Sequence, residues 1–174
     1  MTSDQPRFRL LFIVAAIVLM TVAAPGLGLG LSAAPGPPAS SFTWPLDPPP
    51  TVSRPFEQPP GPYAAGHRGV DLVAEPGARV LAAASGTVVF AGRVVDRGVV
   101  SIRHGPALRS TYEPLEPSVG VGEEVAAGQV IGTLLAGHRG CPGPACLHWG
   151  LRRGGAYLDP LLTLTPLRVR LLPH

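Results

Sequence analysis

The sequence predicts an all-β domain, mostly antiparallel, with the form of a half-open barrel or sandwich. From Arg79 onward, short apolar runs rich in β-branched residues alternate with glycine-containing turns, which is typical of successive antiparallel strands. No segment after Leu31 sustains the helical period of apolar residues. The chain also holds 22 glycines and 22 prolines among 174 residues, a content that disfavours an all-helical protein.

Residues 1–33 are predicted to be an export segment. Arg7 and Arg9 precede residues 10–31, an apolar stretch without charge that is long enough to cross a bilayer core of about 30 Å. Small residues such as Ala33 favour a cleaved signal peptide, and an uncleaved membrane anchor is the alternative. In both cases the arginines stay inside, so the rest of the chain is expected outside the cytoplasm.

Residues 34–62 are rich in proline and are expected to form a spacer in extended conformations. Apolar side chains within this segment can lie against the folded part, so the domain can effectively begin near Trp44 rather than at Tyr63. The β domain itself is expected over residues 63–165. Residues 166–174 are expected to be a carboxyl-terminal tail.

The charge of the chain excludes several functions. All 14 basic residues are arginines, against 11 acidic residues, for a net charge of +3. Chemistry that needs a lysine amine is therefore excluded. The arginines are scattered along the chain without stacking aromatics, which predicts no nucleic-acid binding.

Three residues have the chemistry of a metal site. His67 and Asp71 lie four apart in the segment GHRGVDL, and His148 lies in the apolar run CLHWGL. Two imidazole nitrogens and one carboxylate oxygen form the ligand set of an open zinc site, whose fourth position is left for water. On spacing alone, a surface His–Asp pair is the competing interpretation.

Six segments occur in an order that resembles the LytM-type (M23) zinc metallopeptidases, which cut peptidoglycan peptides. They are GHRGVDL, EPGARVLAAASGTVVFAG, VVSIRHG, STYEPL, VGEEVAAGQVIG and CLHWGL. The resemblance implies a LytM-type β core with Zn²⁺ bound by His67, Asp71 and His148, and hydrolysis of cell-wall peptides by zinc-activated water. It also implies a protein that faces the cell wall, with peptidoglycan or its stem peptides as partner. Residues 1–33 would add contact with the membrane if they are not cleaved.

The sequence departs from this family at two positions. The family has two further histidines that assist the reaction, and this chain has Pro114 and Cys146 there. The alternative function is therefore a catalytically degenerate domain that binds peptidoglycan or activates a separate wall hydrolase. Glu113 is the candidate substitute base, because a carboxylate beside zinc serves that role in other metalloproteases. Strand alternation would bring Glu113 inward only through a bulge or a turn at Pro114; otherwise it is a solvated carboxylate.

The two cysteines, Cys141 and Cys146, are expected to form a disulfide. The intervening PGPA favours a turn, and the expected compartment is oxidising. Two alternatives remain open at this point. In one, His138, Cys141, Cys146 and His148 hold a structural zinc ion, and in the other the Cys146 thiolate acts on zinc-activated water.

Overall fold

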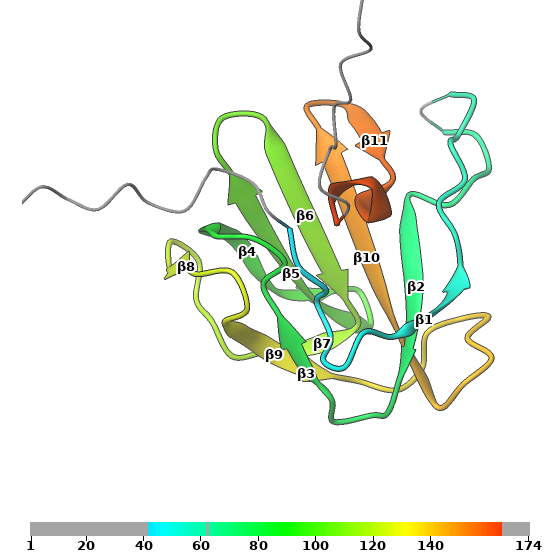
Figure 1. The fold of residues 1–174 in the computed structure, drawn as a ribbon, viewed down its shortest axis with the longest axis horizontal. Helices are drawn as coiled ribbons and strands as arrows, with labels where there is room; N and C mark the ends of the chain where they lie inside the picture. Colours follow the sequence, from blue (N-terminus) through cyan, green and yellow to red (C-terminus); the bar gives the residue numbers. More distant parts are fainter. Residues whose placement is uncertain (1–41, 62, 165–174) are drawn as a thin grey trace, which may run out of the picture. The chain divides into compact units, whose positions relative to one another are not determined.

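The computed structural model describes residues 42–61 and 63–164, which form eleven strands and one short 3₁₀ helix (Figure 1). The larger sheet has eight strands in the order β1-β2-β10-β6-β5-β4-β8, with β11 paired to β10, and all pairs are antiparallel. The smaller sheet has the order β3-β9-β7. The elements are β1 (Thr51–Arg54), β2 (Gly69–Ala74), β3 (Arg79–Leu81), β4 (Gly86–Val94), β5 (Arg97–His104), β6 (Leu108–Glu113), β7 (Leu115–Pro117), β8 (Glu124–Val125), β9 (Val130–Leu134), β10 (Ala145–Arg153), β11 (Ala156–Leu158) and η1 (Pro160–Thr163).

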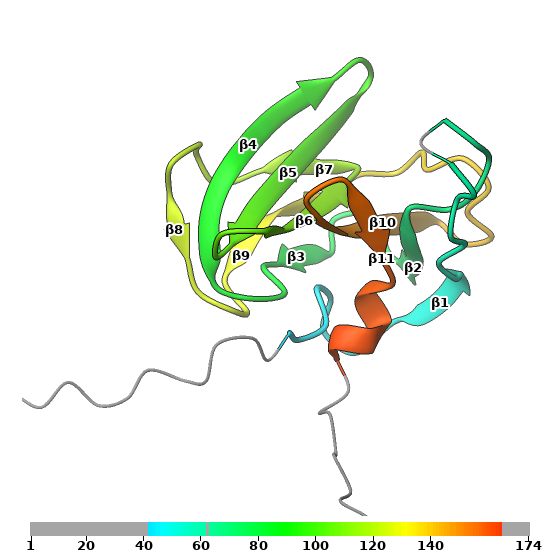
Figure 2. The same ribbon diagram turned by 90° about the horizontal axis from the view of Figure 1, so that it is seen from above.

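The expected all-β, antiparallel fold class is confirmed, in the form of two packed sheets and not of a closed barrel. Strands β4 and β5 make a long curved hairpin that extends well beyond the smaller sheet (Figure 2). Strand β10 lies between β2 and β6 in the larger sheet. Two of the segments that contain sequence motifs, β2 and β10, are therefore neighbours in space.

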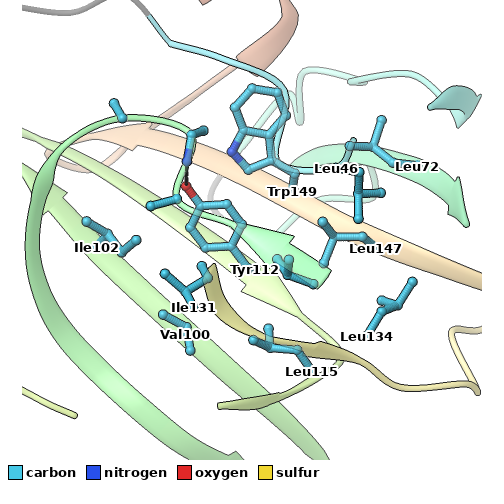
Figure 3. Close-up of a cluster of buried hydrophobic side chains, with 14 of the residues drawn as sticks. Leu46, Leu72, Val100, Ile102, Tyr112, Leu115, Ile131, Leu134, Leu147 and Trp149 are labelled. Atoms are coloured by element: carbon cyan, nitrogen blue, oxygen red, sulfur yellow. Dashed lines mark hydrogen bonds between the residues drawn. The ribbon is translucent and has the colours of Figure 1, made fainter. Parts of the chain in front are cut away.

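The core lies between the two sheets (Figure 3). Alternate residues of β6 and β10 face it, including Tyr112 and Trp149, which are both fully buried. Ile131 of β9 and Leu115 of β7 pack against them from the smaller sheet. Because side chains alternate along a strand, the residues between these core positions face the opposite side of the larger sheet. That side is polar and carries the candidate site.

A chain of hydrogen bonds crosses one end of the core. The Tyr112 hydroxyl accepts from the backbone N–H of Ala83 (3.0 Å) and is hydrogen-bonded to Ser110 Oγ (2.9 Å). Ser110 Oγ in turn lies 2.7 Å from His104 Nε2, and His104 Nδ1 donates to the Ser85 carbonyl (2.8 Å). Burial raises the pKa of Tyr112 to about 12, so its hydroxyl stays protonated within this network.

Part of the segment expected as a spacer belongs to the folded domain. Phe42 and Leu46 are buried in the core, and β1 pairs with β2. Residues of the segment 42–61 therefore contribute to the core and to the larger sheet. The predicted export segment 1–33, the first part of the predicted spacer (residues 34–41), residue 165 and the predicted tail 166–174 lie outside the described residues. Within residues 42–61 and 63–164, no helix has the length and apolar character needed to cross a membrane.

Candidate metal centre

The site is built across three adjacent strands on the polar face of the larger sheet. His148 of β10 is paired in register with Asp71 of β2 on one side and with Glu113 of β6 on the other. Directly paired residues of antiparallel strands project from the same face. The three side chains therefore form a row across the sheet, and His67 joins them from the segment just before β2.

Three donor atoms converge at one point. His67 Nε2 lies 3.0 Å from Asp71 Oδ1 and 3.1 Å from His148 Nδ1, and His148 Nδ1 lies 2.8 Å from Asp71 Oδ1. Ligands bound tetrahedrally at about 2.0–2.1 Å from a zinc ion are separated by roughly 3.3 Å from one another. The structure thus brings together the three residues that the sequence analysis selected, at separations suited to a shared metal ion.

The hydrogen bonds behind these donors set the His67 tautomer. His67 Nδ1 donates to the Pro55 carbonyl at 2.7 Å, so in the neutral ring Nε2 carries a lone pair directed at the cluster. Asp71 Oδ1 and His148 Nδ1 face the same point, and three mutually close acceptors repel one another unless a proton or a cation lies between them. This donor set fits the zinc ion that the resemblance implies.

The electrostatics of the cluster favour an ionised carboxylate. Burial alone would raise the pKa of Asp71. The hydrogen bond from His148 and the nearby imidazoles of His138, His148 and His67 outweigh burial, so the pKa of Asp71 is lowered. Asp71 is therefore charged at neutral pH, as a metal ligand must be.

His138 lies beside Asp71, a position that the sequence analysis did not predict. It lies in the loop between β9 and β10, where its Nε2 is 3.5 Å from Asp71 Oδ1 and its ring stacks 6.0 Å from the ring of His148. The Nδ1 atom of His138 is buried and has no hydrogen-bond partner among the described residues. The sequence analysis considered this histidine only as part of a cysteine-containing zinc site. The sequence separation of His138 from the three donor residues does not predict its position in space, because a loop has no fixed period.

Glu113 faces the site without any bulge. The register of β6 against β10 turns Tyr112 into the core and Glu113 to the polar face, so the expectation that only a bulge or a turn at Pro114 would bring it inward was wrong. The Glu113 carboxylate is also not simply solvated, because Arg97 Nε donates to its Oε2 at 3.1 Å. This hydrogen bond raises the pKa of the Arg97 guanidinium.

Cys141 and Cys146 are joined in a disulfide in the structure. Neither sulfur is therefore present as a thiolate, and the two alternatives that require a free thiol have no support in this geometry. Cys146 lies two positions before His148 in β10 and is fully buried. The disulfide closes the loop that follows His138 onto the strand that carries His148.

A groove of about 440 Å³ runs beside the donor cluster on the polar face. His148 and Glu113 line one part of it, and Gly150, Thr111 and several arginines line the rest. A second hollow of about 280 Å³ has Arg97, Glu113 and His138 in its wall. Because Glu113 and Arg97 line both hollows, the two hollows adjoin at this pair of residues.

An all-β domain that holds a His–Asp–His donor set beside an open groove has the arrangement of a metallopeptidase domain. The chain belongs to peptidase family M23, whose family model matches residues 65–160. Members of this family are zinc metallopeptidases, typically associated with the cell wall or extracellular.

Curated relatives and solved structures are also similar to this chain. The uncharacterized protein Rv2891 of Mycobacterium tuberculosis is 50% identical over 137 residues, which cover 75% of this chain and 55% of that protein. The chain thus spans about half the length of the curated relatives it matches. The catalytic domain of the antimicrobial peptidase lysostaphin from Staphylococcus simulans superimposes with a TM-score of 0.57 and 26% identity, over 66% of this chain and 92% of that one. The SpoIIQ–SpoIIIAH pore-forming complex matches with a TM-score of 0.63 and 24% identity, over 72% of this chain and 92% of that one, and shows the fold alone.

Proposed function

We propose that this protein is an exported zinc metalloendopeptidase that cleaves peptidoglycan peptides, secreted or held at the membrane by its amino-terminal segment. The observation that carries the proposal is the convergence of His67 Nε2, Asp71 Oδ1 and His148 Nδ1 within 3.1 Å of one another. His148 lines the groove beside these atoms, so a peptide bound in the groove would lie next to the donor cluster. Peptidoglycan is the substrate class that the M23 family assignment favours.

The proposed roles of the residues follow from their contacts. His67, Asp71 and His148 would hold the zinc ion, which acts as a Lewis acid toward water and the peptide carbonyl. Pro55 holds the proton of His67 on Nδ1, away from the metal position. Glu113 Oε2 accepts from Arg97, so this carboxylate is better suited to orient a substrate N–H or a water than to take up a proton.

His138 is the better candidate to move a proton. Its ring lies beside Asp71 and His148, and its Nδ1 atom has no competing hydrogen bond among the described residues. Imidazole is the side chain that most often serves as general acid or base in enzymes. His138 thereby offers an imidazole to a site whose two expected auxiliary positions hold a proline and a disulfide-bonded cysteine.

Incubation of the purified full chain with cross-linked peptidoglycan and zinc tests the proposal. We expect the release of new peptide amino termini, abolished in His67→Ala and reduced about 10²- to 10⁴-fold in His138→Ala, the usual effect of losing acid–base help. His104→Asn is the matched control, because His104 lies on the core side and contacts neither the donor cluster nor the groove. No release by the wild-type chain with zinc bound would overturn the hydrolytic proposal.

The second candidate is a degenerate domain that binds peptidoglycan or activates a separate wall hydrolase. The specific observation in its favour is that neither Pro114 nor Cys146 can act as an acid or base: the proline side chain is a hydrocarbon ring, and the cysteine sulfur is in a disulfide. In that case the chain would sediment with peptidoglycan without cleaving it. Cleavage by an added wall hydrolase would then rise in its presence, and His67→Ala would leave this stimulation unchanged if no metal is involved.

A further inference from the structure

Two arginines lie side by side in the lining of the groove, away from the donor cluster. Arg109 of β6 and Arg152 of β10 are directly paired in register, and both line the groove. Like charges at directly opposite positions of antiparallel strands destabilise a sheet. Within the part of the chain that the structure describes, neither arginine forms an ion pair with a carboxylate. No carboxylate of the described residues therefore offsets the repulsion between these two side chains.

The other charges in the groove wall do not neutralise this pair. Arg97 is already bound to Glu113, the one acidic residue in the lining. Arg68 also lines the groove, where its guanidinium donates to the Ala64 carbonyl (3.1 Å) and stacks 5.5 Å from the centre of the Tyr157 ring. The region around Arg109 and Arg152 is thus strongly positive, and both side chains are half-buried rather than fully hydrated.

Gly150 keeps the floor open between this pair and the donor cluster. It lies midway between His148 and Arg152 on the same face of β10. A Cβ on Gly150 would lie 3.2 Å from the Arg68 carbonyl oxygen and 3.7 Å from His148 Nε2, so any side chain would narrow the groove. The groove consequently continues along β10 from His148 to Arg152. Four strand residues correspond to about 13 Å, the length of three to four residues of an extended peptide.

We infer that Arg109 and Arg152 form a subsite for a carboxylate of the peptide bound in this groove, three to four residues from the peptide bond that lies at the donor cluster. The inference rests on the proposed function for the nature of the ligand, an extended peptide. Paired guanidinium groups recognise a carboxylate by charge-assisted, often bidentate hydrogen bonds. A single pair at one register position suits one anionic group, whereas a polyanion such as a phosphodiester polymer is bound through many phosphate contacts.

Equilibrium binding of two labelled peptides tests the subsite. The full chain is titrated, in the presence of a chelator that prevents cleavage, against hexapeptide amides of glycine and alanine that carry an uncharged coumarin label and one glutamate or, in the matched probe, one glutamine. We expect the glutamate peptide to bind about tenfold more tightly, the effect of a charge-assisted hydrogen bond in a partly exposed groove. Arg109→Gln and Arg152→Gln should each remove most of this preference. Arg79→Gln, which removes an exposed arginine from the other sheet, should leave it unchanged.

Several results would overturn the inference. These are equal affinity for the two peptides, no measurable binding of the glutamate peptide, or a preference that survives in both groove variants. Tighter binding of a polyglycerol phosphate than of the glutamate peptide would assign the pair to a phosphate polymer instead. Unchanged thermal unfolding of the variants shows that they are folded. A preference for the glutamate peptide without cleavage of peptidoglycan would support the subsite and overturn the hydrolytic function. Cleavage of peptidoglycan without this preference would support the hydrolytic function and overturn the subsite.

Discussion

Gly69 leaves open the space that the ring of His148 occupies. A Cβ at position 69 would lie 2.8 Å from both Cε1 and Nε2 of His148, and 2.5 Å from the Trp149 carbonyl oxygen. Real side chains do not approach so closely. The orientation of a metal-facing imidazole therefore depends on the absence of a side chain on the neighbouring strand.

Replacement of this glycine is expected to weaken metal binding. In Gly69→Ala the His148 ring must shift, and loss of the support of a ligand typically lowers metal affinity about 10- to 100-fold. The measurement is competition for zinc against a chromophoric chelator. Gly92→Ala is the matched control, because a Cβ there meets only the Phe90 ring at 3.7 Å, an ordinary contact. Equal zinc affinity of wild type and Gly69→Ala would show that the ring is not held by this packing.

Zinc is expected to stabilise the folded protein through the three donors. A ligand that binds only the native state at 100 times its dissociation constant adds about 2.7 kcal/mol to the free energy of unfolding. Urea unfolding with zinc and with a chelator measures this difference. Asp71→Asn should abolish most of it, whereas Asp96→Asn, at a side chain that is 81% exposed, should retain it. A zinc effect of the same size in Asp71→Asn would place the metal elsewhere.

Removal of the Tyr112 hydroxyl is expected to destabilise the domain. In Tyr112→Phe the buried backbone N–H of Ala83 loses its acceptor and Ser110 Oγ loses a partner. An unsatisfied buried polar group costs about 1–3 kcal/mol, which urea unfolding can measure. Tyr63→Phe is the control, since Tyr63 is fully exposed and should show no change. The prediction fails if both variants unfold at the same urea concentration.

The stability of the domain is expected to fall as the pH drops below neutral. Burial lowers the pKa of His104, and the hydrogen bond to the Ser85 carbonyl opposes this effect only in part. The folded state therefore resists protonation, while the unfolded chain takes up a proton below its usual pKa of about 6.5. The stability contribution is complete above that pH and is lost as the pH falls toward the folded pKa, by at most about 1.4 kcal/mol per pH unit for one proton.

Urea unfolding of the zinc-free protein between neutral and mildly acidic pH measures this dependence. His104→Asn, which does not titrate, should show a smaller slope than wild type. The difference between the two slopes isolates His104 from His67 and His148, which remain in both proteins. Identical slopes would mean that His104 is protonated equally in the folded and unfolded states.

The sequence was sufficient for the strands and for selecting three residues that the structure brings together. Short β-branched runs and turn glycines predict antiparallel strands, and His67, Asp71 and His148 carry the chemistry of a metal site in their side chains. The hydrogen bond that orients His67 was not predictable, because its acceptor is the backbone carbonyl of Pro55, which has no signature in the sequence. The placements of His138 and of Arg109 against Arg152 were also not predictable, since a loop path and a long-range register depend on the whole fold.

The central position of β10 has a consequence for the synthesis of the protein. His148 lies 77 residues after Asp71, and only β11 and η1 follow β10 among the described elements. A nascent chain that has emerged only as far as β9 therefore has β2 and β6 without the strand that joins them, and two unpaired edges that can associate with other chains. The pairing of β10 with β2 and β6 covers both unpaired edges and also brings His148 to Asp71. The chain therefore cannot bind metal through this cluster before those two strand edges are paired.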